Sequence, residues 1–357
     1  MRKFSLILLA ALAALILPCL SARAQEGVQP EEDDIDVTGI IFEHVGDAYE
    51  WHIINIKDKP VALYLPVILH SRTSGWHCFS SRHIVEGETY EGFRIAGEDE
   101  KHAGKLVEPQ PDGSVLKPLD LSITKNVLGL MINSIILVVL ILCAARWYRK
   151  HDATEEAPRG FAGIVEMMVT MVEDDIIKDC IGKDYKRYSP FLLTAFFFIF
   201  INNLMGIVPF FPGGANITGN IAITMVLALC TFFAVNVFGN KHYWKDILWP
   251  DVPVFLKAFP LMPLIEIIGM FTKPFSLMVR LFANILAGHC MIIGVVCVVF
   301  LTAKMGLAMN AGLSVVAVFI GVFMDILELL VAFLQAYVFT MLSSVFIGLS
   351  RQEPETE

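Results

Sequence analysis

An arginine stands in the middle of a long apolar run, residues 274–300, in which Asn284 and His289 are the other strongly polar side chains. This residue, Arg280, keeps its positive charge because the pKa of a guanidinium stays above about 12. Even on a permissive insertion scale, an arginine at the centre of a membrane helix costs about 2.5–3.5 kcal/mol. Such a residue usually serves an ion or substrate pathway. The alternative is an arginine that extends its head group from a helix end to the interface, but apolar residues extend far on both sides here.

Composition supports a membrane location for most of the chain. Hydrophobic residues make up 55% of the 357 residues, charged residues make up 18%, and the mean hydropathy is +0.62. Soluble domains average about 45–50% apolar residues. A single soluble core is therefore excluded for most of the chain.

The N-terminus has the pattern of an exported protein. Residues 1–24 begin with the basic residues Arg2 and Lys3, continue with an apolar stretch and finish with an A-x-A site that ends at Ala24, and together these features predict a cleaved signal peptide. An uncleaved additional membrane helix is the alternative, although the apolar stretch is short for one. Residues 25–36 are rich in acidic side chains and predict a disordered leader.

Residues 37–120 are predicted to form a small soluble module rich in β-strands. The runs at 51–56 and 61–65 consist of β-formers separated by turn residues, and glycines interrupt the chain further on. Six histidines lie in this module, but their spacing matches no metal-ligand pattern, and we interpret them as surface or core residues. They are His44, His52, His70, His77, His83 and His102.

Five apolar segments follow, each long enough to cross about 30 Å of hydrocarbon. They lie at 127–145, 190–208, 217–238, 261–300 and 311–349, within a membrane domain at 121–350. The last two are too long for a perpendicular span, so they must tilt, bend or lie partly in the membrane plane. Basic residues cluster after the first segment, which places that connection in the cytoplasm, the N-terminus outside and the tail 351–357 inside. The predicted fold class is an all-α polytopic membrane protein with a small β-rich N-terminal module.

The connection after the first span contains an amphipathic pattern. Apolar side chains recur there at helical spacing, namely Ile164, Met167, Met168, Met171 and Val172. This pattern predicts a helix that lies at the membrane surface or against a partner helix. It adds one interfacial amphipathic helix to the five spans.

Small side chains share the helix face of Arg280. At about 100° per residue, the positions close to it are Ser276, Ala283, Ala287 and Gly294. A strip of small residues lets another backbone approach closely. We interpret the strip as a contact surface for a partner, with ordinary packing inside the chain as the alternative.

Two more polar residues lie on this helix. Asn284 follows Arg280 by one turn, so we expect its amide to hydrogen-bond near the guanidinium. His289 lies on the opposite face, about 13 Å along the axis from Arg280. Polar groups on opposite faces and at different depths suit two separate aqueous routes.

The final segment carries a second polar group. Glu328 and Gln335 share one face, and Asp325 precedes Glu328 by one turn. A histidine on one helix and a glutamate on the next can share or pass a proton near neutral pH, so we expect His289 and Glu328 to pair. A purely structural ion pair is the alternative.

These residues lie in segments that resemble a known family. Residues 280–289 (RLFANILAGH) resemble the arginine-helix motif of subunit a of F-type ATP synthases, and residues 328–339 (ELLVAFLQAYVF) resemble the last-helix motif of the same family. Residues 200–209 and 266–274 give supporting matches. The resemblance covers about residues 120–350, over which motif order, spacing and topology agree.

The resemblance implies a stator channel beside a rotating ring of c subunits, with a b-subunit peripheral stalk, in the F1Fo ATP synthase of a bacterial inner membrane. Arg280 would be the essential arginine, which attracts a ring carboxylate into its ionised form and blocks direct proton leakage between two half-channels. The other residues implied for the proton pathway are Asn284, His289, Glu328, Gln335, Asp325, Asn203 and Glu266. No cofactor, metal or nucleic acid is implied, and nucleotide chemistry belongs to other subunits.

The sequence departs from the usual family pattern in three ways. Some members carry glutamate at the His289 position and histidine at the Glu328 position, so this chain resembles an exchanged version. Gly206 stands where many relatives place an acidic residue near the external entrance, which leaves open whether Asp325 or the acidic leader compensates. The module at 37–120 is not part of the usual pattern.

Two other classes of function remain open at this point. A self-contained ion channel or transporter would also need polar groups in its membrane helices, and an intramembrane enzyme would use Glu328 and His289. The strip beside Arg280 favours a partner ring, and the sequence has no H-E-x-x-H motif, serine–histidine pairing or P-loop to support catalysis within the chain. We expect the transported ion to be H⁺ rather than Na⁺, because the sequence has no obvious cluster of oxygen ligands for Na⁺.

Overall fold

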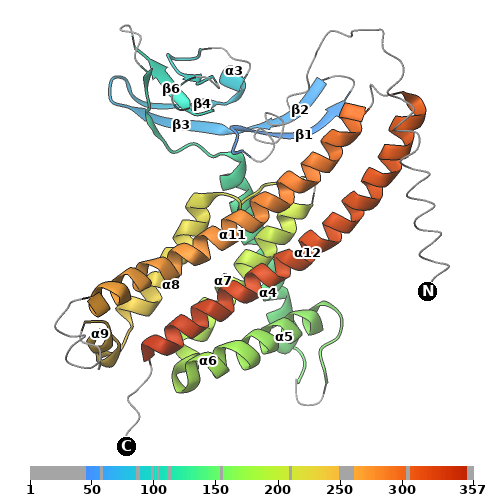
Figure 1. The fold of residues 1–357 in the computed structure, drawn as a ribbon. Helices are drawn as coiled ribbons and strands as arrows, with labels where there is room; N and C mark the ends of the chain where they lie inside the picture. The colour runs from blue at the N-terminus through green and yellow to red at the C-terminus, as the bar shows by residue number, and fades with distance from the viewer. Residues whose placement is uncertain are drawn as a thin grey trace, which may run out of the picture. The chain divides into compact units, whose positions relative to one another are not determined.

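A computed structural model describes residues 46–56, 59–85, 89–97, 100, 102, 104–110, 115–152, 156–208, 211–248, 261–302 and 306–351 (Figure 1). The predicted signal peptide at 1–24, the acidic leader at 25–36 and most of the tail at 351–357 lie outside these residues. Strands dominate the described chain up to Asp120, and helices follow from Lys125 onward.

Small antiparallel sheets make up the described part of the module. The strands predicted at 51–56 and 61–65 are present as β1 (Glu50–Ile56) and β2 (Lys59–Tyr64), which pair with each other. A second sheet has the order β4-β3-β8, formed by β3 (Pro66–Ser71), β4 (Gly75–Ser80) and β8 (Leu119–Asp120). A third has the order β5-β6-β7, formed by β5 (Arg94–Ile95), β6 (Leu106–Pro109) and β7 (Val115–Leu116).

The module has its own hydrophobic core. Along β3 the side chains of Val67 and Leu69 are buried while those between them are more exposed, which is the period of two expected of a strand covered on one face. Phe79 of β4 and Phe93 pack against them, together with Ile84 of the one-turn helix α3 (Arg82–Val85). These contacts hold the small sheets together.

Each predicted membrane span corresponds to a helix. They are α4 (Lys125–Tyr148), α7 (Tyr185–Ile207), α8 (Ile221–Val237), α11 (Leu261–Thr302) and α12 (Leu307–Arg351). Among the described residues, four helical stretches are long and apolar enough to cross a membrane, and α8 is a shorter apolar helix. The last two helices have 42 and 45 residues, as their long apolar segments predict. The predicted fold class is confirmed.

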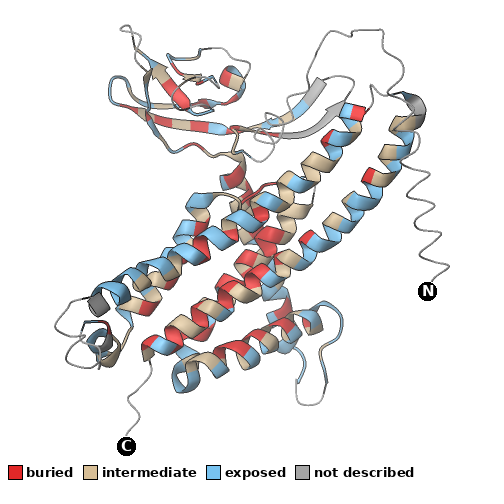
Figure 2. Ribbon diagram, in the orientation of Figure 1, coloured by how far each residue is buried: buried red, intermediate tan, exposed pale blue. Residues whose placement is uncertain are grey.

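The outer faces of these helices are apolar. Phe271, Phe275 and Phe319 are among the large apolar side chains exposed on α11 and α12, along which Figure 2 shows mainly exposed and intermediate residues. Asparagine, threonine and serine side chains are instead buried between the helices. This arrangement inverts the pattern of a soluble protein and suits a bundle surrounded by lipid.

Helix α12 is the centre of the packing around the polar residues. It packs along both α11 and α7, and α11 also packs against α8. Phe196 of α7, Leu281 of α11 and Phe339 of α12 belong to one buried cluster. At its C-terminal end, the Arg351 guanidinium pairs with the Asp184 carboxylate at the start of α7. Polar residues on α7, α11 and α12 are therefore brought to common interfaces.

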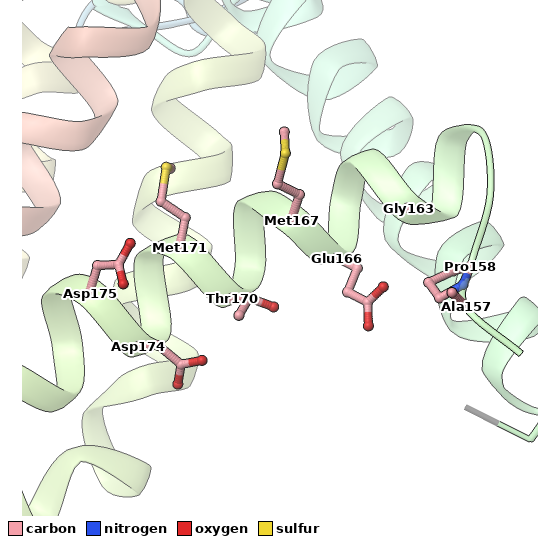
Figure 3. Close-up of a pocket in the computed structure, with 9 residues that line it drawn as sticks. All are labelled: Ala157, Pro158, Gly163, Glu166, Met167, Thr170, Met171, Asp174 and Asp175. Carbon is pink, nitrogen blue, oxygen red and sulfur yellow. The ribbon is translucent and has the colours of Figure 1, made fainter. Parts of the chain in front are cut away.

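The predicted amphipathic helix is present as α5 (Phe161–Val172), which continues through a π-helical stretch (Glu173–Lys178) into α6 (Asp179–Ile181). Met167 and Met171 point to one side of this helix, and Glu166 and Asp174 point to the other (Figure 3). The separation of apolar and polar side chains is the one that the sequence pattern predicts.

The apolar stripe of α5 is divided between two environments. Met168 and Val172 are buried in the core of the bundle, whereas Ile164 and Met167 are exposed. One edge of the stripe faces the neighbouring helices, so the other edge is left on the surface. An exposed apolar edge of this kind suits a helix that lies in the membrane interface.

Candidate functional site

Arg280 lies near the middle of α11 on the exposed surface of the chain. Its guanidinium has no hydrogen-bond or ion-pair partner among the described residues. Ser276, Ala283 and Ala287 of the predicted strip are exposed around it. The chain therefore presents a fixed positive charge on a surface of small side chains, and nothing within the described residues neutralises it.

Behind this surface, two amides join α11 to α12. The Asn284 Nδ2 group donates to Gln335 Oε1 at 2.8 Å, and the Gln335 Nε2 group donates to the Arg280 backbone carbonyl at 2.9 Å. Helical spacing predicts that the Asn284 amide bonds near the guanidinium, but it bonds across the helix interface instead. Buried Gln335 thus fixes the backbone that carries Arg280 without contacting its charge.

His289 and Glu328 meet between α11 and α12. The His289 Nδ1 and Glu328 Oε1 atoms are 2.8 Å apart, and the side chains are only 13% and 5% exposed. The contact lacks hydrogen-bond alignment, and neither atom has another hydrogen-bond partner among the described residues. Gly288 makes room for the carboxylate, because a Cβ there would lie 3.1 Å from Glu328 Oε1. The predicted pairing is therefore present as a close electrostatic contact.

Gly206 of α7 borders the other side of the histidine ring. A Cβ at this position would lie 3.9 Å from His289 Cε1 and 4.0 Å from Nε2. The imidazole is thus flanked by a carboxylate at Nδ1 and by a glycine near Nε2. An acidic side chain at position 206 would point toward this ring, so the glycine leaves space beside a group that can carry a proton.

Asn203 connects α7 to the same region. Its Nδ2 group donates to the Ala332 carbonyl of α12 at 3.4 Å, and its Oδ1 atom accepts a hydrogen bond from the Thr218 hydroxyl at 2.6 Å. Asn203 and Thr218 are both buried, at 2% and 1% exposure. The asparagine therefore holds α7, α12 and the connection between α7 and α8 together.

Asp325 and Glu266 do not join these clusters. Asp325 is exposed on α12, one turn before Glu328. Glu266 is exposed near the start of α11, about 21 Å along the axis from Arg280. Its charge acts instead on Tyr243 of α9 (Lys241–Leu248), whose pKa is raised by burial and then by Glu266.

Sequence reasoning missed two polar contacts in the bundle. Thr218 was not singled out, and neither was the buried pair in which Asn133 Nδ2 of α4 donates to Asn202 Oδ1 of α7 at 3.0 Å. The available signal was the presence of amides inside apolar segments, since buried polar groups in a membrane need partners.

Three described histidines of the module have a carboxylate or an aromatic ring as a neighbour. His77 Nδ1 lies 2.6 Å from the Glu91 carboxylate, His70 contacts the Trp76 ring, and the His83 ring stacks on another aromatic ring. In the described part of the chain, no three metal-binding side chains lie close enough together to hold an ion. His44 and the His52 side chain lie outside what the structure describes.

Long apolar helices, an outward arginine and a buried histidine–glutamate contact define a membrane protein with the polar groups of an ion-translocating subunit. The profile of a family described as ATP synthase A chain matches residues 130–348, and that of a domain of unknown function (DUF8433) matches residues 40–121. The chain belongs to the ATP synthase A chain family.

Individual relatives agree with this assignment. The chain is 33% identical to ATP synthase subunit a 2 of Chlorobaculum tepidum, over 94% of this chain and 90% of the relative. It is 35% identical to ATP synthase subunit a of Chlorobium phaeobacteroides, over 80% of this chain and 83% of the relative. It is 42% identical to ATP synthase subunit a of Myxococcus xanthus, over 66% of this chain and 74% of the relative.

Proposed function

We infer that this chain is the proton-translocating stator subunit in the membrane sector of a rotary ATP synthase. The observation that carries this inference is the family match over 130–348, which contains all the polar residues of the site. Enzymatic activity belongs to the assembled complex, in which this chain supplies the proton path and other subunits supply the nucleotide chemistry.

Arg280 acts on a partner in this proposal. Its exposed charge is free to attract an ionised carboxylate on a neighbouring ring of c subunits, and the small residues around it allow a partner helix to come close. A guanidinium cannot release its proton, so it does not pass protons itself. It therefore separates two half-channels while the ring carboxylate moves past it.

His289 and Glu328 act on the proton in this proposal. The ring nitrogen beside Gly206 takes up a proton, and Nδ1 releases one to the Glu328 carboxylate 2.8 Å away. Imidazole suits this task because its two nitrogens exchange protons near neutral pH. Asn203, Asn284 and Gln335 hold the helices in place around this route, and Asp325 and Glu266 extend it toward the two surfaces.

The distribution of basic residues supports a proposal for the topology. We propose that the signal peptide at 1–24 is cleaved, that the module at 37–120 lies outside the bacterial inner membrane, and that the tail at 351–357 lies in the cytoplasm. The domain boundaries are those of the sequence analysis, with the membrane domain at 121–350. Partners in this proposal are the c-subunit ring, the b-subunit peripheral stalk and the remainder of the F1Fo complex.

Co-purification tests the proposal against the alternative of a self-contained channel or transporter. A tagged version of the full chain, extracted from its native membrane in mild detergent, should bring down c and b subunits in fixed ratio with ATPase activity. A chain that purifies alone and conducts protons in vesicles would contradict the stator assignment. The exposed strip beside Arg280 favours the first result, because a closed pore does not need an outward arginine.

A further inference from the structure

A tryptophan of the module is buried against the membrane domain. Trp51 of β1 is 3% exposed and forms a cluster with Ala215 and Ile217, which lie in the connection between α7 and α8. Its ring also meets the Phe211 ring edge-to-face, with centroids 5.1 Å apart. Leu128 of α4 packs against the same cluster. A large aromatic side chain of the module is therefore inserted against the 211–218 connection.

The same connection reaches the His289 pair from its other side. The Ala215 carbonyl lies 3.8 Å from the position of a Cβ at Gly206, and His289 Cε1 lies 3.9 Å from that same point. Three residues further on, Thr218 donates to Asn203. Ala215 thus lies between Trp51 and the space that Gly206 leaves beside the imidazole.

The connection has little room to move. A Cβ at Gly129 of α4 would lie 2.8 Å from the Ala215 Cβ, so the helix backbone presses directly on this residue. The module is tied to the first turn of α4 as well, because the Lys125 N–H donates to the Ala48 carbonyl at 2.9 Å and the Asn126 N–H donates to the Asp47 carboxylate at 3.1 Å. Tightly packed elements transmit small displacements, so a change at Trp51 is passed to Ala215.

We propose that Trp51 is a positioning residue for proton access, through which the module holds Ala215 against the space that Gly206 leaves beside His289. The proposal rests on the proposed function of the His289–Glu328 pair. It gives the module a task in the mechanism: its tryptophan keeps the outer end of the route narrow, so that water and ions reach the imidazole only through a defined gap.

A cysteine at position 206, in the space beside the imidazole, can report on access and so tests this proposal. Gly206→Cys places a thiol where a side chain makes ordinary contacts, and a membrane-impermeant maleimide is added to intact spheroplasts that contain the full complex. With Trp51 present, labelling should be slow; with Trp51→Ala it should rise several-fold. Trp51→Phe, which retains a ring, should stay close to the parent rate. Chains that keep Gly206 give the background from the native cysteines.

A second tryptophan of the module provides the matched control. Trp76 of β4 is 64% exposed, so Trp76→Ala removes the same side chain without touching the connection and should leave labelling unchanged. Equal labelling in Trp51→Ala and the parent would overturn the proposal, as would an equal rise in Trp76→Ala.

A variant on the connection itself covers the case in which Trp51→Ala prevents assembly. Phe211 is 41% exposed, and Phe211→Ala removes the ring contact from the other side. We expect a smaller rise in labelling of the assembled complex. An unchanged rate in the assembled complex would overturn the proposal. Failure of this variant also to assemble would overturn it too, because it would show that the connection is a folding element. Labelling needs no proton transport, so these results do not depend on the proposed task of Arg280.

Discussion

Arg280 and His289 lie on the same helix, α11, but in opposite environments. Arg280 is exposed and has no partner among the described residues, whereas His289, two to three turns further along α11, lies 2.8 Å from a buried glutamate. A charge at a membrane surface of small residues must be neutralised by something beyond the chain. A buried acid–base pair is neutralised within it. In the proposed function, the arginine therefore acts on a partner, and the pair acts on a proton.

The largest loss of activity should follow from removal of the exposed Arg280 charge. Arg280→Ala should abolish ATP synthesis and ATP-driven proton pumping while the complex still assembles, because no described hydrogen bond or ion pair of the guanidinium is lost. Passive proton leak should persist or rise, since the charge that is proposed to separate the half-channels is gone. Arg280→Lys should fail too, because a desolvated ammonium can release its proton and lacks the planar fork.

The measurements are ATP synthesis and quinacrine quenching in inverted membrane vesicles, with Ser276→Ala as the control on the same exposed strip. Normal synthesis by either arginine variant would show that Arg280 does not have the proposed task. Failure of the complex to assemble would mean that Arg280 is needed for the structure of the complex.

Removal of either side chain of the buried His289–Glu328 pair should reduce proton flux strongly without abolishing it. His289→Ala and Glu328→Ala each leave a buried partner without its counter-group, at a cost of about 1–3 kcal/mol. If that cost appears in the rate-limiting step, proton flux should fall by a factor of about 5 to about 160. The double exchange, His289→Glu with Glu328→His, should recover more flux than either single change, because the same two groups meet again.

A double-mutant cycle on proton flux measures this coupling directly. Strictly additive losses, with no recovery in the exchanged variant, would mean that the two side chains do not work as a unit. That outcome would leave the proposed task of Arg280 unaffected and would contradict only the proposed proton transfer between His289 and Glu328.

The amides between the two regions should matter less. Gln335→Ala removes the donor to the Arg280 carbonyl and the acceptor of the Asn284 amide, each hydrogen bond contributing about 0.5–1.5 kcal/mol. We expect a several-fold loss of ATP synthesis with passive leak unchanged, because the guanidinium itself remains. Asn284→Ala, which removes only one of the two bonds, should have the smaller effect. A loss as complete as that of Arg280→Ala would mean that Gln335 takes part in proton transfer.

The membrane helices could be predicted from the sequence because hydropathy is a property of a continuous segment. The span expected at 261–300 is α11 at Leu261–Thr302, and the one expected at 311–349 is α12 at Leu307–Arg351. The face that carries Arg280 could be predicted too, since helical spacing fixes which residues share a face. The structure places that face on the surface, as expected.

Contacts between elements were harder to predict. Helical spacing places Asn284 near Arg280 on one helix, but only the relative register of α11 and α12 shows that its amide meets Gln335. The pairing of two-residue strands such as β5 and β7 depends on distant partners in the same way. The sequence predicts only that Trp51 lies in a β-strand, and no neighbouring residue indicates that its ring packs on Ala215.

The smallest effect is expected at a carboxylate of the module that, unlike Glu328 Oε1, accepts hydrogen bonds from neighbouring hydroxyl groups. Glu108 of the module accepts hydrogen bonds from the Ser71 and Thr73 hydroxyls, and these lower its pKa below the ordinary value. A lowered pKa means that this contribution to stability is present above the unfolded pKa, near 4.3, and is lost as the pH falls through the folded pKa. The site is partly exposed, so the contribution should stay below about 1 kcal/mol.

Glu108→Gln should therefore leave ATP synthesis unchanged and make the module less sensitive to acid. In the purified complex, the protection of β3 and β6 amides against hydrogen exchange, measured relative to the intrinsic exchange rate at each pH, should fall between about pH 5 and pH 3 in the parent chain, and this acid-dependent loss should shrink in the variant. Ser71→Ala, which keeps the carboxylate but removes a donor, should shrink it as well. Identical acid dependence in all three chains would mean that these hydroxyls do not hold the carboxylate in its ionised form. The contrast with Glu328, which has no aligned donor in the described chain, would then lose its physical basis.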